Sequence, residues 1–438
     1  MLSRALMPSH LLVERALALI PDSEEFLPLS DAVIGTSRVD SEKVWARSGA
    51  YATVGKRVVD AAGLRALIPG LAERAQQRLQ RLFDLVLEAI QKQEEGDLPA
   101  AAATLVQAGE MEEQDRRLDK AENIYALALE IARNLREKGP QVLALRRLGR
   151  VTRAAGRLDE AWVWYEQSYL LAVDEMDLAG QAVGCQGLGN LCDDRGQREQ
   201  AWTWYERGLK LARALQDPAL EWPFHANLSI LAMNRGELSR AEDFLGRARS
   251  CIEATGDEGA MLYWFNNRGL ILLEGGDALG AEAMFREGLE RCRNAFWEIL
   301  LRVNLGDALV RQERFFEAEE EARRAEEVAI AHRYIPQLVE VYGVFGKIAR
   351  ARCDEEGFVF YEQALNVCRE RGLPVVKEAG VYHDYGLLYL ACGRLPEAEA
   401  YLEQARAVYR DLGLGQELVK VDRELLAVRP LEEQELMA

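Results

Sequence analysis

The chain has 438 residues, of which 49% are hydrophobic and 29% are charged, and its formal net charge is -18. This hydrophobic content excludes a disordered chain, and the length exceeds what a single hydrophobic core ordinarily serves. The negative charge repels phosphates, which disfavours non-specific binding to nucleic acids and favours basic or neutral partners.

Residues 1–70 do not match the rest of the chain, and we expect them to form a non-repeat helical segment. Glu14 and Arg15 interrupt the first apolar run, so no signal peptide is expected. No apolar run approaches the roughly 20 residues that span a bilayer, so membrane insertion is not expected either. A Pro-Gly pair then precedes a long amphipathic helix, and we expect residues 71–99 to cap the structure.

From residue 100 to residue 412 the chain aligns with itself at a period near 40 residues. The segment GRLDEAWVWYEQSYLLA from Gly156 is a near copy of GQREQAWTWYERGLKLA from Gly196, and related segments begin at Gly236 and Gly276. Weaker copies lie near 116, 313, 352 and 393, which gives eight units with two departures from register. Self-similarity at this period is typical of a solenoid whose repeats contact only their neighbours.

Three positions recur around each turn residue, which we number 15. Position 8 is mostly glycine, position 20 mostly alanine and position 24 often aromatic, as in Gly149, Ala161 and Tyr165. The unit near 352 has Phe345, Gly357 and Tyr361 there, and it lacks the turn glycine. Glycine and alanine let two helix backbones approach closely, and an aromatic ring fills the gap between helices.

This pattern resembles the tetratricopeptide-repeat family, in particular the long-repeat branch that includes kinesin light chains and bacterial peptide-sensing regulators. The resemblance covers about residues 100–412. It implies an all-α, right-handed solenoid superhelix of about eight helix-turn-helix repeats, with the first helix of each repeat lining a concave groove. Residues 413–438 are expected to form a C-terminal capping helix and an acidic tail.

The most informative polar position is position 6 of the expected first helices. It holds Asn227, Asn267 and Asn304 in three consecutive units. A carboxamide both donates and accepts hydrogen bonds, so it can pair with the backbone of an extended ligand. Our hypothesis is a peptide-binding site centred on these residues, with Tyr263 and Asn266 beside them. The alternative is that the amides are merely exposed or bond to one another within the stack.

Two further sets of residues are candidates for binding. Arg146, Arg147 and Arg150 share a helix face and are expected to attract the acidic end of a ligand. The alternative is that they pair with Glu110, Glu113 and similar neighbours. Position 21 is glutamate in five units but tryptophan at Trp162 and Trp202, which predicts a possible second interface. The alternative there is local packing.

Catalytic and metal-binding motifs are not expected. The segment from 49 to 56, GAYATVGK, departs from a phosphate-binding loop in its glycine spacing, and Arg57 stands where Ser or Thr would bind magnesium. The four histidines have no carboxylate or cysteine at metal-ligand spacing. The seven cysteines form no CxxC pair, which fits a reducing cytoplasm. We therefore predict no enzymatic activity, no cofactor and no metal.

These observations predict a cytoplasmic, bacterial scaffold that binds a partner protein or an extended peptide in the concave groove. Three alternatives stay open. The first is a peptide-responsive signalling regulator that sequesters or releases an effector. The second is an enzyme or effector activity in the N-terminal 70 residues. The third is an RNA-binding helical repeat, which the net charge disfavours.

Overall fold

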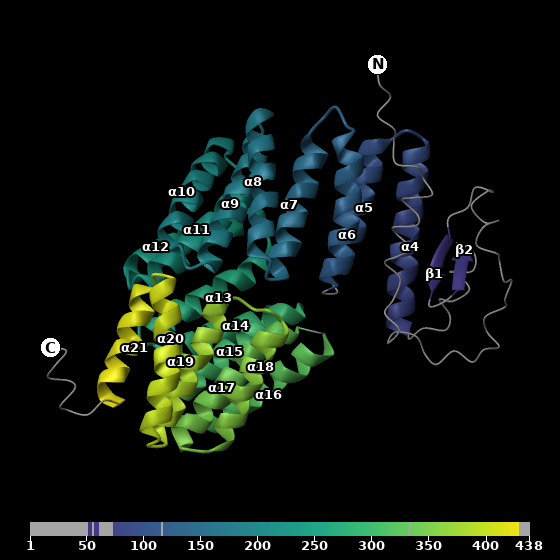
Figure 1. Cartoon of the computed structure of the whole chain (residues 1–438). Helices are drawn as coiled ribbons and strands as arrows, with labels where there is room; N and C mark the ends of the chain where they lie inside the picture. Colours follow the sequence, from purple (N-terminus) through teal and green to yellow (C-terminus); the bar gives the residue numbers. More distant parts are fainter. Residues whose placement is uncertain (1–50, 55–56, 61–72, 115–116, 333, 429–438) are drawn as a thin grey trace. The chain divides into compact units, whose positions relative to one another are not determined.

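The computed structural model describes residues 51–54, 57–60, 73–114, 117–332 and 334–428. The chain divides into two compact units, residues 1–180 and residues 181–438. Nearly all described residues are helical, and the helices follow one another in packed pairs (Figure 1). We call the earlier helix of each pair the first helix and the later one the second helix.

The first unit holds a single leading helix and two helix pairs, which are repeats 1 and 2. Its helices are α4 (Glu73–Glu94), α5 (Leu98–Gln114), α6 (Leu118–Arg133), α7 (Gly139–Ala154) and α8 (Leu158–Asp174). Helix α4 occupies the place where a capping helix is expected from the sequence, and it packs on α5. Buried apolar residues of α4 to α7 form one continuous core.

Six more pairs, repeats 3 to 8, and a terminal helix follow. They are α9 (Leu178–Asp194), α10 (Arg198–Leu215), α11 (Pro218–Asn234), α12 (Leu238–Thr255), α13 (Glu258–Glu274), α14 (Ala278–Arg291), α15 (Ala295–Arg311), α16 (Phe315–Ala331), the 3-10 helix η3 (Ile335–Gln337), α17 (Leu338–Arg352), α18 (Glu356–Glu370), α19 (Val375–Ala391), α20 (Leu395–Asp411) and α21 (Gly415–Val428). Within 98–411 the described residues therefore form eight helix pairs, which confirms the predicted all-α solenoid.

A short antiparallel hairpin precedes the helices. Strand β1 (Tyr51–Val54) pairs with β2 (Arg57–Asp60), with Tyr51 opposite Asp60. The expectation of a helical segment over residues 1–70 is therefore wrong for these residues. Their content of β-branched side chains, Thr and Val, favours strands over helices. The rest of that segment lies outside the described residues.

The turns between paired helices confirm the predicted positions with one correction. Gly156, Gly196, Gly236, Gly276 and Gly393 all have positive φ, between 72° and 86°. Glu313 takes the same conformation at φ 61°. In repeat 7 the left-handed residue is Cys353, at φ 52°, and not Arg352. The expected turn near 116 lies at residues outside the described ones.

The glycine at position 8 is required by the ring at position 24. A Cβ atom added to Gly189 would lie 2.4 Å from the Tyr205 ring, and one added to Gly346 would lie 2.3 Å from Cζ of Tyr361. Repeat 7 therefore uses Gly346 and not Phe345 at this position. The alanines predicted at position 20 have no exposed surface, as Ala161 and Ala241 illustrate. Each glycine lets a ring lie flat against the first helix.

The first helices line the inner side of the solenoid. In the second unit α11 contacts α13, and α13, α15, α17 and α19 contact one another in turn. No comparable contact joins successive second helices among the described residues of this unit. We call the surface formed by the first helices the inner face.

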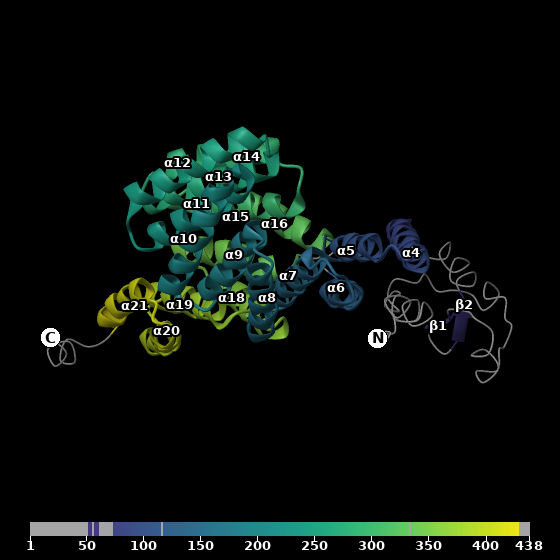
Figure 2. The ribbon, with the colours of Figure 1, turned by 90° about the horizontal axis from the view of Figure 1, so that it is seen from above.

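The C-terminal helix α21 packs back on the turns of earlier repeats in the second unit (Figures 1 and 2). Arg198 pairs with Glu417 at 2.8 Å, a contact between residues 219 positions apart. Leu414 lies against Gly196, and Lys420 lies 3.7 Å from Glu274. The C-terminal segment thus contacts the turns of repeats 3 to 5 of the same unit, and we call this contact the seam.

Candidate functional site

The predicted asparagines lie on first helices, but their amides bond to neighbouring side chains. Nδ2 of Asn227 donates to Oδ1 of Asn190 at 3.1 Å, and the Tyr263 hydroxyl donates to Oδ1 of Asn227 at 3.1 Å. Asn190 also accepts a hydrogen bond from the Tyr205 hydroxyl, at 2.8 Å. Asn190, on α9, is a member that the sequence analysis missed, because it occupies position 9 and not position 6.

The second half of this set spans α13 and α15. Nδ2 of Asn304 donates to Oδ1 of Asn266 at 2.7 Å, and Nδ2 of Asn266 donates to Oδ1 of Asn267 at 3.2 Å. Asn267 is only 3% exposed, so the expectation that it projects freely into a groove is wrong. These amides hydrogen-bond to one another within the stack, as the alternative interpretation predicts. Nδ2 of Asn267 is buried and has no acceptor among the described residues.

We refer to these five asparagines (Asn190, Asn227, Asn266, Asn267 and Asn304) as the amide row. Hydrogen bonds join Asn190 to Asn227, and a second set joins Asn304, Asn266 and Asn267. Together the two sets cross the first helices of repeats 3 to 6. An amide that already bonds to another amide still has unused donor or acceptor capacity. Asn190, Asn227 and Asn304 are half-buried and have access to solvent, whereas Asn266 and Asn267 are buried.

An aromatic row runs beside the amide row. The Tyr263 ring lies 5.7 Å from Trp222 and 5.7 Å from Trp297, edge to face in both cases. The row continues from Trp297 through Phe296 to Tyr334, again with 5.7 Å between ring centroids. All five side chains are half-buried. The signal in the sequence is an aromatic residue near the start of four successive first helices.

The predicted arginine face lies on α7 of the first unit, and two of its members are paired. Arg150 contacts Glu113 at 2.6 Å, Arg147 pairs with Glu110, and Glu113 also accepts the Tyr125 hydroxyl at 2.7 Å. This is the pairing that the alternative interpretation predicts. Arg146 makes no ion pair with a described residue. Burial, and then the charges of Arg147 and Arg150, lower the pKa of its guanidinium.

Trp202 is covered by arginines and not open to a partner. Only 8% of it is exposed, and the guanidinium carbons of Arg235 and Arg240 lie 4.4 and 4.5 Å from its ring centroid. Local packing, the alternative interpretation, therefore holds at Trp202. Trp162 is half-buried.

Position 21 has a consistent role that sequence reasoning missed: it accepts an arginine from the next repeat. The carboxylate acceptors are Glu122 with Arg157, Glu242 with Arg268, Glu282 with Arg314 and Glu319 with Arg352. Aromatic rings replace the carboxylate at Trp202 and at Phe358, which lies 5.3 Å from Arg394. A ring face and a carboxylate both attract a guanidinium, so glutamate and aromatic residues are interchangeable here.

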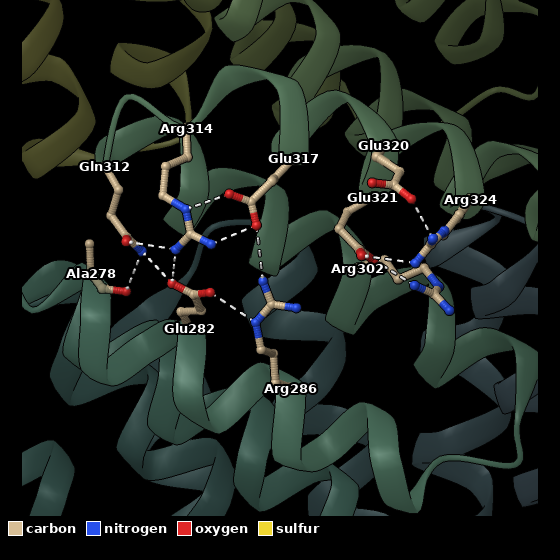
Figure 3. Close-up of polar contacts among 10 residues, drawn as sticks. All are labelled: Ala278, Glu282, Arg286, Arg302, Gln312, Arg314, Glu317, Glu320, Glu321 and Arg324. Carbon is tan, nitrogen blue, oxygen red and sulfur yellow. Dashed lines mark hydrogen bonds and ion pairs between the residues drawn. The ribbon is translucent and has the colours of Figure 1, made fainter.

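Figure 3 shows the most extensive of these networks, between α14, α15 and α16. Glu282 accepts hydrogen bonds from Arg286 at 2.8 Å, Gln312 at 3.0 Å and Arg314 at 2.6 Å. Burial alone raises the pKa of the Glu282 carboxyl, but the hydrogen bonds from Gln312 and Arg286 and the charge of Arg314 outweigh it and lower the pKa. These charges are mutually satisfied and make a structural contact between repeats.

Two histidines contact carboxylates, contrary to the expectation from sequence. Nε2 of His225 lies 3.1 Å from Glu221 one helical turn away, and His383 pairs with Glu424. Burial lowers the pKa of His225 and outweighs the opposing effect of the hydrogen bond that the ring makes to the Glu221 carboxylate. Among the described residues no group of three or more His, Cys, Asp or Glu side chains could hold a metal ion. The helices within that part of the chain include none long and apolar enough to cross a bilayer.

Comparison with known families identifies the type of one repeat. Residues 379–412, which cover most of α19 and all of α20, match a tetratricopeptide-repeat family model. A search of curated protein sequences gave no match.

Several solved structures share the fold at low identity. A Rap protein solved in complex with competence and sporulation factor is 12% identical, covers 81% of this chain and 97% of its own, and has a TM-score of 0.54. The Rap conjugation regulator of plasmid pLS20, solved with the Phr* peptide, is 13% identical with 77% and 96% coverage and a TM-score of 0.54. The apo form of the quorum sensor NprR from B. thuringiensis is 12% identical with 77% and 99% coverage and a TM-score of 0.51.

Proposed function

We propose that this chain, a tetratricopeptide-repeat protein, is a non-catalytic binding protein that holds an extended peptide, or an extended segment of a partner protein, on the inner face of its second unit. The amide row is the observation that carries the proposal. Peptide bonds present one donor and one acceptor each, and a carboxamide matches both.

The chemistry of the row favours a backbone ligand over an ion. Its members are uncharged, and Asn267 holds a buried donor that has no acceptor within the described part of the chain. A buried donor that stays unpaired costs free energy, on the order of 1–3 kcal/mol, which a ligand carbonyl would recover after a small side-chain rearrangement. The half-buried aromatic row beside it offers apolar surface for ligand side chains.

Arg146 in the first unit is the predicted arginine that keeps free hydrogen-bonding capacity. Arg147 and Arg150 would have to leave Glu110 and Glu113 to contact a ligand. We therefore propose that Arg146 is the residue of this first-unit face that attracts an acidic group. We place the protein in the cytoplasm, where its free cysteines stay reduced.

The test is a triple variant, Asn227→Ala, Asn267→Ala and Asn304→Ala, with the exposed Asn134→Ala as its matched control. A partner captured by pull-down is identified by mass spectrometry, and its affinity is then measured by calorimetry. We expect the triple variant to lose affinity roughly tenfold or more, because each lost hydrogen bond contributes about 0.5–1.5 kcal/mol. Equal affinities for the triple variant, the control and the wild type would place the interface elsewhere.

A second candidate is a peptide-responsive regulator that sequesters or releases an effector. It is favoured by the similar Rap structures, two of which were solved with a bound peptide or factor. A regulator changes its affinity for the effector when peptide is added, whereas a plain scaffold does not. Pull-down of the partner with and without peptide separates the two.

A further inference from the structure

Two helix glycines on the inner face have no packing reason to be glycine. A Cβ atom added to Gly343 on α17, or to Gly380 on α19, would have nothing within 4 Å among the described residues. At Gly189 and Gly346, in contrast, it would clash with a ring. Glycine is less favourable than alanine inside a helix, so these two positions give up stability to leave space open.

Each of these two glycines is followed, one helical turn later, by a charged residue. Lys347 is one helical turn after Gly343, and Asp384 is one turn after Gly380, so each charge shares a helix face with its glycine. Nζ of Lys347 donates to both carboxylate oxygens of Asp307, at 3.0 and 2.8 Å, which makes a close ion pair. We call the surface around Gly343 and Gly380 the notch.

The second charge pair at the notch is loosely held. Arg350 lies 4.0 Å from Asp384, and the side chains are 32% and 30% exposed. No hydrogen bond joins them, so the guanidinium keeps its donors and the carboxylate keeps its acceptors. A group that both accepts and donates would fit between them.

The Tyr361 hydroxyl is a third unsatisfied group at this place. Tyr361 is 1% exposed, and its hydroxyl has no hydrogen-bond partner among the described residues. Its Cζ atom lies against Gly346, one residue from Lys347. Burial, and then the charge of Asp384, raise the pKa of Tyr361, while Arg350 opposes the shift, so the hydroxyl lies within the field of that pair.

We propose that the notch is a subsite for the backbone of an extended peptide, in which a peptide carbonyl accepts from Arg350 and Tyr361 while the adjacent N–H donates to Asp384, and a ligand side chain fills the space over Gly343 and Gly380. This inference rests on the proposed function and extends the peptide site from the amide row to repeats 7 and 8. The Arg350–Asp384 pair does with two side chains what one asparagine does with its carboxamide.

The charges around the notch favour a neutral, dipolar ligand such as a peptide backbone. Asp307, Lys347, Arg350 and Asp384 sum to zero at neutral pH. A free anion would meet two carboxylates, and a free cation would meet two cations. A neutral dipole meets no net repulsion, and its two ends satisfy Arg350 and Asp384 together.

The probe is a fluorescein-labelled positional-scanning hexapeptide library, read by fluorescence polarisation, from which the tightest peptide on the wild-type protein is taken forward. The first variant is Gly343→Leu with Gly380→Leu, which fills the notch. Its matched control is Gly246→Leu, at a helix glycine of α12 that is equally open but exposed on a second helix. We expect the double variant to lose peptide affinity at least tenfold with no fall in melting temperature, and the control to bind like the wild type.

The second variant, Tyr361→Phe, removes the unpaired hydroxyl. We expect peptide affinity to fall about three- to tenfold while the melting temperature does not fall, because the hydroxyl has no hydrogen-bond partner among the residues that the structure describes. A merely structural tyrosine would show the opposite pattern. Wild-type affinity in both the leucine and the phenylalanine variants would overturn the subsite.

The triple asparagine variant separates this failure from failure of the proposed function. If that variant loses the peptide while the notch variants keep it, the inner face binds peptide but the notch is not part of the site. If no library peptide binds the wild-type protein, the proposed function and the subsite are both wrong.

Discussion

At the scale of single residues, glycines on one helix do opposite things. Gly346 and Gly343 both lie on α17, three residues apart, yet a Cβ atom would clash with Tyr361 at the first and meet open space at the second. We expect Gly346→Ala to destabilise the fold by about 1–3 kcal/mol through overpacking. Gly343→Ala should stabilise it by about 0.4–1 kcal/mol. Chemical denaturation of the two variants measures both, and a destabilising Gly343→Ala would show that the notch is already filled.

The sequence predicts the first of these roles but not the second. A glycine that recurs at position 8 with an aromatic residue at position 24 is a repeated signal, because five of the eight repeats make the same contact. Gly343 shares position 6 only with Gly187, and Gly380 has no counterpart, so only the structure shows that a Cβ atom added at Gly343 or Gly380 would have no described atom within 4 Å. The amide row has the same limit. Asn227 and Asn304 follow the repeat, but whether an amide faces solvent or another amide depends on how neighbouring helices pack.

At the scale of the element, contacts between repeats depend on an arginine that meets position 21. The sequence has glutamate at most of these positions and aromatic residues at the others. This pattern predicts a solvent-exposed position, with Trp162 and Trp202 as a possible interface. The structure replaces that interpretation with one acceptor role, as at Glu282 and Trp202. The partner arginine lies in the next repeat at variable positions, such as Arg268 and Arg314, so periodicity alone does not reveal it.

Acid should weaken this contact, and Glu282 shows why. Its pKa is lowered in the folded protein from the ordinary value of 4.5. The charged form therefore stabilises the fold above about pH 4.5, and that stabilisation is lost as the pH falls through the lower, folded-state pKa. We expect Glu282→Gln to lower the urea midpoint at pH 7, with the difference from wild type shrinking below pH 4.5. A difference that is constant from pH 7 to pH 3.5 would contradict this assignment.

In repeat 7 the structure gives a packing reason for a glycine that departs from the repeat pattern. The missing turn glycine of this repeat and Gly357 inside α18 suggest a weak point in the sequence. In the structure a Cβ atom on Gly357 would lie 2.8 Å from both Ala349 and Leu388, so this glycine is needed for the close approach of α18 to its neighbours. The left-handed turn residue, Cys353, lies four residues before Gly357 instead of the five residues found from Gly156 to Ala161. One residue is missing from the turn, and the helix still keeps its packing.

At the scale of the second unit, the seam is the feature that the sequence could not predict. The repeat pattern predicts which helices are neighbours in the stack. Arg198 and Glu417 lie on helices that are far apart in that order, so the pattern does not predict their contact. Their contact depends on the rotation accumulated over the intervening repeats, to which every helix crossing contributes a small angle. The terminal helix α21 was expected only to cover the apolar end of repeat 8. It also contacts the turns at Gly196 and Gly236, through Leu414 and Gln416.

The seam should open more readily when its ion pair is removed. Arg198 and Glu417 are about one-quarter exposed and joined by two hydrogen bonds, so we expect the pair to contribute on the order of 1 kcal/mol, or about a fivefold change in local opening. Arg198→Ala should therefore speed amide hydrogen exchange in α21 about fivefold at low salt.

The control Arg249→Ala removes an exposed pair with Glu253 that lies away from the seam, and it should leave α21 unchanged. High salt should bring the wild type towards the variant, because it screens the pair. The exchanged pair, Arg198→Glu with Glu417→Arg, should restore protection. If exchange in α21 is the same in the wild type and in Arg198→Ala, other contacts hold the seam together, and the ion pair is incidental.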